Sequence, residues 1–156
     1  MKFTLLVVGK TTDKNIQTLI DDYQGRLRHY IQFELQVIPE LKNSKNLTQE
    51  QQKTEEGRLL LSMVQTSDCL LLLDEHGKEY RSIEFADYMQ RLMSAGRNVV
   101  FAVGGPYGFS RAVYDRADGK LSLSKMTFSH QMVRLFFVEQ IYRAMTILRG
   151  EPYHHE

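Results

Sequence analysis

The chain has a single cysteine and no tryptophan among its 156 residues. One cysteine, Cys69, cannot form a disulfide within the chain, which argues against a disulfide-held secreted scaffold and favours a reducing compartment such as the cytoplasm. Long hydrophobic runs are also lacking. The first apolar segment, residues 3–8, is too short to cross a membrane and shows no signal-peptide cleavage pattern. We therefore expect a cytoplasmic protein with no membrane partner.

An excess of either charge is missing as well. The chain has 20 Lys and Arg residues against 19 Asp and Glu residues. Such a balance argues against a purely electrostatic nucleic-acid binder, which would be strongly basic, but it leaves room for a local basic patch. We find no internal repeat and no low-complexity tract. The length, with an apolar share of 42%, predicts one domain spanning residues 1–156.

What the chain does have is a regular alternation of short apolar runs and amphipathic segments. This alternation predicts an α/β fold, a mainly parallel sheet with helices on both faces. The segment 33–38 alternates apolar and polar residues before Pro39, so it is expected near a sheet edge. The other expected strands are residues 3–8, 69–73, 99–103 and the start of 121–128, and the expected helices are residues 13–30, 48–64, 82–95, 111–117 and 130–149.

Residues 98–110 are the stretch around which the rest is organised. The unbroken apolar run 99–103 is rich in β-branched residues and predicts a strand buried on both faces. Gly104, Gly105 and Gly108 follow it at once. Glycines at the carboxyl end of a buried strand let a ligand approach the main chain, and ligands of open α/β sheets bind at that edge. The alternative is a tight turn from strand to helix.

Asp74 also follows an expected strand, so it is either a functional group at that edge or a turn-making aspartate. The glycine stretch matches no standard nucleotide loop. No lysine lies near enough for the GxxxxGK[ST] pattern, and a GxGxxG fingerprint would follow the first strand.

Two catalytic alternatives are weak. Ser110 stands in a near match to the GxSxG nucleophile elbow and would need His130 with Asp115 or Asp118, but a helix cap explains it better. The histidines in residues 154–156 suggest a metal site. Adjacent side chains of an extended tail point in opposite directions and no third ligand is near, so we expect no metal.

Two further segments have open interpretations. The lysine-bearing segment 42–56 is a mobile loop and solvated helix beginning at Thr48, or a surface that contacts a polyanion through Lys42, Lys45 and Lys53. The last helix, residues 130–149, is apolar around most of its circumference. A helix of this kind lies deep in a core or packs on a second subunit, and we expect a homodimer.

Taken together, these motifs resemble the SPOUT class of methyltransferases. Within that class, the chain is similar to the small single-domain enzymes that methylate nitrogen N3 of a pseudouridine in large-subunit (23S) ribosomal RNA. The resemblance covers essentially the whole chain in order. It is carried by Leu73-Asp74, the run from Val103 to Gly108, the run from Leu121 to Phe128 with His130, Arg134, the run from Glu139 to Ala144, and Pro152-Tyr153-His154.

The resemblance implies features that periodicity does not. The carboxyl-terminal part would be threaded into a trefoil knot, S-adenosyl-L-methionine would donate the methyl group, and the enzyme would be a homodimer without metal. A near-neutral charge fits a substrate that is the assembled ribosome rather than naked RNA. A non-catalytic α/β module that binds RNA or nucleotides is the alternative.

The resemblance also implies a site. Leu73, Gly104 and Gly105 would line the cofactor site, and the knot loop around it would be Leu123, Ser124, Lys125, Met126, Thr127 and Phe128. Tyr153 and His154 are the candidates for removing the proton from the base nitrogen. Arg143 and Arg134 would hold RNA phosphate or the tail, and His130 would anchor the last helix. Because Pro152 follows Gly150, we expect an extended tail that makes few core contacts.

Overall fold

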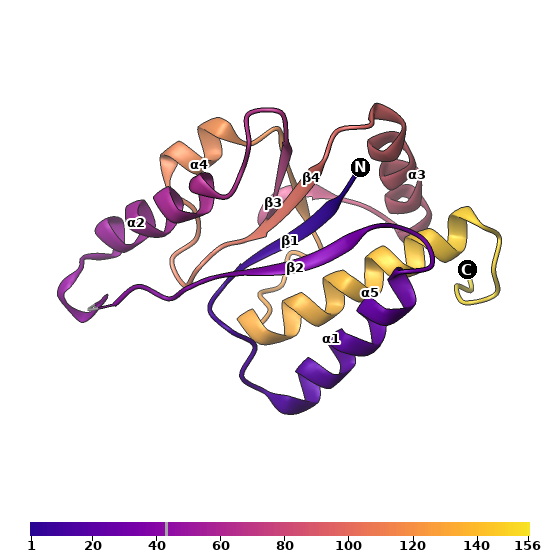
Figure 1. The fold of residues 1–156 in the computed structure, drawn as a ribbon, viewed down its shortest axis with the longest axis horizontal. Coiled ribbons are helices and arrows are strands. Elements are labelled where there is room, and N and C mark those ends of the chain that lie inside the picture. Colours follow the sequence, from indigo (N-terminus) through magenta and orange to yellow (C-terminus); the bar gives the residue numbers. More distant parts are fainter. Residues whose placement is uncertain (43) are drawn as a thin grey trace.

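The computed structural model describes residues 1–42 and 44–156. In this part of the chain five parallel strands form one sheet in the order β2-β1-β4-β3-β5, as Figure 1 shows. The position of β2 at one edge confirms the expectation from its alternating sequence. The strands are β1 (Phe3–Val8), β2 (Phe33–Ile38), β3 (Cys69–Glu79), β4 (Val99–Val103) and β5 (Gly119–Ser122).

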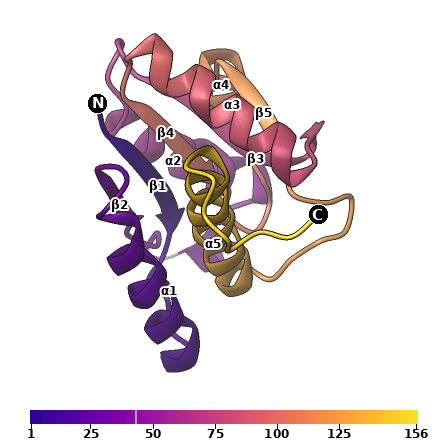
Figure 2. The same cartoon turned by 90° about the vertical axis from the view of Figure 1, so that its right-hand side faces the viewer.

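Helices cover both faces of the sheet, which confirms the predicted fold class. The helices are α1 (Lys14–Leu27), α2 (Gln49–Ser62), α3 (Ser82–Ala95), α4 (Arg111–Arg116) and α5 (His130–Leu148), with a 3-10 turn at Ser44–Asn46. Helix α5 packs between α1 and α3 on one face, while α2 and α4 pack together on the other (Figures 1 and 2). No helix of the described residues is long and apolar enough to span a bilayer.

Helix starts follow local side-chain chemistry. Asp13 caps α1 by accepting a hydrogen bond of 2.8 Å from the Asn15 amide, and Thr48 forms the expected capping box with Gln51. The sequence also predicts Ser82 as the cap of α3, but the cap is Arg81 and Ser82 is the first helical residue. The Glu84 side chain reaches back to accept a hydrogen bond from the Arg81 amide at 2.8 Å.

Strand β3 is longer than its apolar run. Beyond Leu73 the chain bulges outward and then pairs again with β5, so that Leu121 pairs with both Leu73 and Lys78. Gly77 makes this possible, since a Cβ atom there would lie 2.7 Å from the Leu121 main-chain nitrogen. The bulge leaves residues 74–76 free to form one wall of a cavity.

The core has two layers because each central strand is buried on both faces. Phe3 and Phe101 stack at 6.2 Å on the α5 side, where Phe101 also meets Phe137 at 4.8 Å. Leu6 and Leu72 fill the layer beneath α2 and α4. This burial explains the continuous apolar runs of the sequence. Helix α5 supplies much of the first layer.

Candidate functional site

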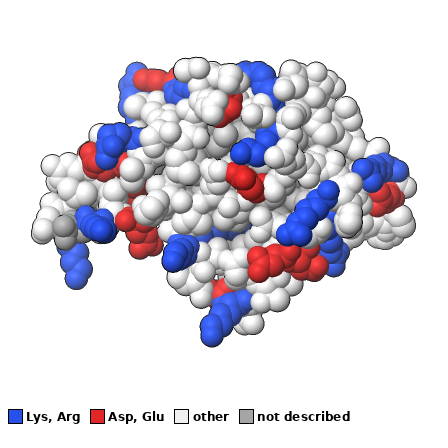
Figure 3. All heavy atoms as spheres, viewed as in Figure 1, with Lys and Arg blue, Asp and Glu red and all other residues white. Residues whose placement is uncertain are grey.

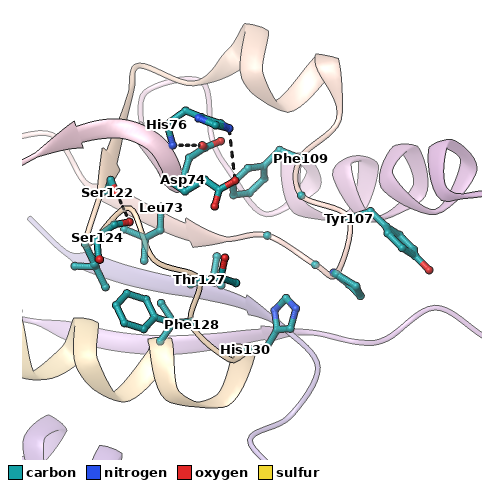
Figure 4. A pocket seen from close by; sticks show the side chains of 18 of the residues that line it. Leu73, Asp74, His76, Tyr107, Phe109, Ser122, Ser124, Thr127, Phe128 and His130 are labelled. Carbon is teal, nitrogen blue, oxygen red and sulfur yellow. Dashed lines mark hydrogen bonds and ion pairs between the residues drawn. The ribbon is translucent and has the colours of Figure 1, made fainter.

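A cavity of about 470 Å³ lies at the carboxyl edge of the sheet. Figure 4 shows how the ends of β3 and β4, the loop after β5 and the start of α5 surround it. Eight of the nine residues that the resemblance assigns to the cofactor line this cavity. They are Leu73, Gly104, Gly105, Leu123, Ser124, Met126, Thr127 and Phe128.

Lys125 is the ninth residue, and its side chain points elsewhere. It is 86% exposed, and its Nζ lies 4.0 Å from Glu79 Oε1. The other five residues of the loop 123–128 form a wall of the cavity, whereas the Lys125 side chain is not part of the lining.

The glycine loop after β4 folds back on itself. The Gly108 amide donates a hydrogen bond to the Gly105 carbonyl at 3.1 Å, and Gly108 has a φ of +83° that favours glycine. At Gly104, a Cβ atom would lie 3.3 Å from the Phe109 ring. This close fit leaves the main chain as the surface that a ligand meets.

The loop from β5 to α5 combines a polar turn with apolar side chains. The Ser122 hydroxyl donates to the Ser124 carbonyl at 2.8 Å, and the Ser124 hydroxyl accepts the Met126 amide at 3.0 Å. Met126 is 76% exposed, and the Phe128 ring packs 5.5 Å from that of Phe136. The loop thus holds apolar groups around the cavity without burying them in the core.

Asp74 makes a turn and also lies in the lining of the cavity. One carboxylate oxygen accepts the His76 amide at 2.8 Å, which makes the turn, while the other accepts a hydrogen bond from the Tyr114 hydroxyl. Burial, and then this hydrogen bond, raises the pKa of Tyr114 to about 12. Asp74 and Tyr114 both line the cavity. Tyr114 was missed by the sequence analysis, because α4 carries no signal that links it to β3.

Glu56 was also missed. It lies on α2 directly beneath Gly105, where a Cβ atom would come within 2.7 Å of its Oε2. The residue is only 7% exposed, its Oε1 has no hydrogen-bond partner among the described residues, and Gln52 donates a long hydrogen bond of 3.4 Å to Oε2. Burial raises the pKa of the Glu56 carboxyl. The interpretation of segment 42–56 as solvated is therefore wrong at its end.

Arg134 does not have the predicted role of holding RNA phosphate or the tail. It is 2% exposed and donates hydrogen bonds to the Val8 carbonyl at 2.8 Å, Thr11 Oγ1 at 3.0 Å and the His130 carbonyl at 3.0 Å. Burial lowers the pKa of its guanidinium. Arg134 fixes the end of β1 against the first turn of α5, where His130 lines the cavity.

Ser110 is a helix cap and not an exposed nucleophile. Its hydroxyl accepts the Val113 amide at 3.4 Å, and the residue is 8% exposed. Among the described residues, no three His, Cys, Asp or Glu side chains are placed to hold a metal ion.

Tyr153, His154 and Arg143 lie together, but near the carboxyl end of α5. Arg143 Nη1 is 3.0 Å from His154 Nδ1, and the Tyr153 hydroxyl donates to Glu139 at 2.9 Å. Helix α5 has 19 residues and so spans about 28 Å. Because the cavity lies at its opposite end, the two candidate bases and Arg143 do not line the cavity of their own chain.

The tail is also packed rather than free. The Tyr153 ring contacts the Tyr142 ring edge-on at 4.8 Å, and its hydroxyl lies 3.1 Å from that of Tyr23 on α1. The expectation that the tail makes few contacts is therefore wrong.

Comparison with known proteins identifies the family. A family model described as "Predicted SPOUT methyltransferase" matches residues 1–154. Proteins from Phocaeicola vulgatus and Bacteroides fragilis are each 60% identical over the full length of both chains, and one from Flavobacterium johnsoniae is 56% identical over the same span. All three are called ribosomal RNA large subunit methyltransferase H. The chain belongs to the SPOUT methyltransferase family.

Proposed function

We propose that this protein transfers a methyl group from S-adenosylmethionine to nitrogen N3 of a pseudouridine in large-subunit ribosomal RNA, on the assembled ribosome. The observation that carries the proposal is that eight residues from separate parts of the chain, which the resemblance assigns to the cofactor site, gather around one cavity at the carboxyl edge of the sheet. The names of the relatives, which are 56–60% identical over their whole length, support the substrate class.

The cavity fits S-adenosylmethionine, the cofactor of this family, in size and chemistry. Its volume of about 470 Å³ falls in the usual range for small-molecule sites. Gly104 and Gly105 offer main-chain donors and acceptors, while Leu123 and Phe128 offer apolar surface for the flat faces of an adenine. The carboxylate of Asp74 adds negative charge to a site for a cationic ligand. When bound, the cofactor supplies an electrophilic methyl group on a positively charged sulfur.

The residues of the chain contribute to the reaction by position and by excluding water. The glycine loop and the loop of residues 122–129 line the cavity, and a site that the bound cofactor and base close to water would favour a step in which charge disappears. Alignment of the base nitrogen with the methyl group supplies a further part of the rate. The N3 proton must leave, and His154 and Tyr153 are the proposed groups near it.

These two residues reach a cavity only if a second subunit provides it. We therefore infer a homodimer in which the tail of one subunit completes the site of the other. An apolar hollow of about 360 Å³ beside α5 supports this arrangement. Phe136, 40% exposed, and Phe128 line it, and both would be covered by a partner.

The same proposal places a single-domain protein in the cytoplasm, where ribosomes occur.

Subunit mixing tests the shared site. Gly104→Val puts bulk where the cofactor meets the main chain, and deletion of residues 153–156 removes the tail. Each variant alone should methylate ribosomes poorly. A mixed dimer has one intact site out of two, so it should regain up to half of the wild-type activity. If mixing restores nothing although mixed dimers are detected by mass spectrometry, the tail does not act across the interface. Binding of S-adenosylmethionine without any methyl transfer by the wild-type protein would favour the non-catalytic module.

A further inference from the structure

The strand order divides the carboxyl edge of the sheet into two halves. The ends of β4, β3 and β5 form the cavity, whereas the ends of β1 and β2 carry lysines. Lys10 and Lys14 follow β1, and Lys42 and Lys45 follow β2. Val8 and Ile38 are paired in the sheet, so the two lysine-bearing segments leave the same point of this edge. We call these four lysines the basic edge.

The basic edge is not neutralised by salt bridges. All four lysines are exposed, and none has a carboxylate within 4.0 Å among residues 1–42 and 44–156. Many arginines of the chain are paired on their own helices, as Arg58 is with Glu55 at 3.0 Å. In Figure 3 blue spheres lie at the lower-left end of the molecule and along its lower rim, with red spheres between them. Within the described part of the chain, the four lysines of the basic edge thus have no carboxylate partner that would compete with an anionic ligand.

The first half of the basic edge is held rigidly beside the cavity. The Thr12 amide donates to Gln131 Oε1 at 2.7 Å, and Gln131 Nε2 donates to the Lys10 carbonyl at 3.4 Å. Arg134 donates to Thr11 in the same loop. Because His130, the neighbour of Gln131, lines the cavity, these bonds fix Lys10 relative to the site.

The second half is also connected to the cavity wall. Lys42 and Lys45 lead into α2, and Glu56 on that helix lies beneath Gly105 of the glycine loop. Helix α2 thus links this part of the basic edge, along the chain, to the glycine loop of the cavity. A base that enters the cavity would bring its neighbouring nucleotides over this surface.

We propose that the basic edge binds backbone phosphates of the ribosomal RNA on one side of the target nucleotide. This inference rests on the proposed function. Lysine ammonium groups suit phosphates as point charges, and phosphate contacts set position and orientation without sequence readout. The concentration of free lysines at one edge explains how a near-neutral protein binds a polyanion.

The test compares two double variants with wild type on ribosomes that lack the methyl group. Lys10→Gln with Lys42→Gln removes charge from the basic edge. Lys2→Gln with Lys120→Gln removes the same charge elsewhere, since Lys2 precedes β1 at the opposite edge and Lys120 lies within β5. The measurements are kcat and KM for ribosomes, ribosome co-sedimentation between 50 and 200 mM salt (about 7 to 14 Å Debye length), and the Kd for S-adenosylmethionine.

We expect the basic-edge variant to raise KM about tenfold, and to lower the slope of log affinity against log salt by roughly 0.7 to 0.9 for each phosphate that the protein no longer neutralises. Its kcat and its Kd for S-adenosylmethionine should stay within twofold of wild type. An unchanged KM, an equal effect in the control variant, or a weaker affinity with an unchanged salt slope would overturn the proposal. If wild type transfers no methyl group yet binds ribosomes through these lysines, the proposed function fails and the surface stands.

Discussion

Truncating Tyr153 to alanine should destabilise the protein as well as impair catalysis. Its hydroxyl donates to Glu139 at 2.9 Å and lies 3.1 Å from the Tyr23 hydroxyl. Its ring meets Tyr142 edge-on at 4.8 Å, and the Arg143 guanidinium lies 4.8 Å from the ring centroid. These contacts join the tail to α1 and α5 in one aromatic cluster.

The size of the effect follows from these contacts. A fully buried aromatic residue loses about 3–5 kcal/mol on change to alanine, and Tyr153 is half-buried, so about 2–3 kcal/mol is expected. The aromatic pair and one hydrogen bond, each worth about 1 kcal/mol, are of the same order. For a chain of 156 residues this corresponds to a Tm about 5–10 °C lower.

Thermal unfolding at one fixed protein concentration measures this effect, with Tyr153→Phe as the matched variant. The phenylalanine keeps the ring and should lose only about 1 kcal/mol. If Tyr153→Ala unfolds within 1 °C of wild type, the packed tail is not a stabilising element. Activity of tail variants should accordingly be expressed per folded protein.

Three further substitutions test the cavity walls. Gly105→Ala should weaken S-adenosylmethionine binding at least tenfold in titration calorimetry, because the new methyl group collides with Glu56. Gly25 has open space around it, so Gly25→Ala is the control. This control should bind the cofactor normally and gain up to about 1 kcal/mol of stability. Glu56 has a pKa of about 4.5 in the unfolded chain and a higher pKa in the folded protein. The wild-type protein therefore becomes less stable as the pH rises above 4.5, because the buried carboxyl must lose its proton. The Tm of Glu56→Gln should therefore be higher than that of wild type at pH 8 and equal to it at pH 4. A difference in Tm that is the same at both pH values would contradict this. Gly77→Ala should lower the Tm by more than 5 °C, since it forces β5 from the main chain of Leu121; an unchanged Tm would show that the strands move apart freely.

Local patterns in the sequence were sufficient to predict most elements. The apolar run 99–103 predicted a strand buried on both faces, and Thr48 with Gln51 predicted the start of α2, because each depends only on neighbouring residues. The continuation of β3 past Leu73 was not predictable in this way. Its polar residues are ordered by pairing with β5, which lies more than 40 positions later.

In the candidate site, too, some features have a local signal in the sequence and others do not. A glycine loop at a strand end follows from general rules for α/β sheets, whereas the residues of the 122–129 loop were identified through the resemblance alone. Glu56 fits beneath Gly105 because that residue has no side chain to exclude it, and the tail is packed because Tyr153 meets Tyr23 on α1 and Tyr142 on α5. Neither contact has a local signal, and no periodicity reveals a knotted chain.

Mass spectrometry of ribosomal RNA tests the central claim most directly. Ribosomes from a strain that lacks the modification are incubated with the protein and S-adenosylmethionine carrying a labelled methyl group, with Gly104→Val as the control. We predict one labelled methyl group, on N3 of a pseudouridine in a single fragment of large-subunit RNA, and none with the variant. A label on a ribose, on another base or on small-subunit RNA, or no label at all with wild-type protein, would contradict the proposed function.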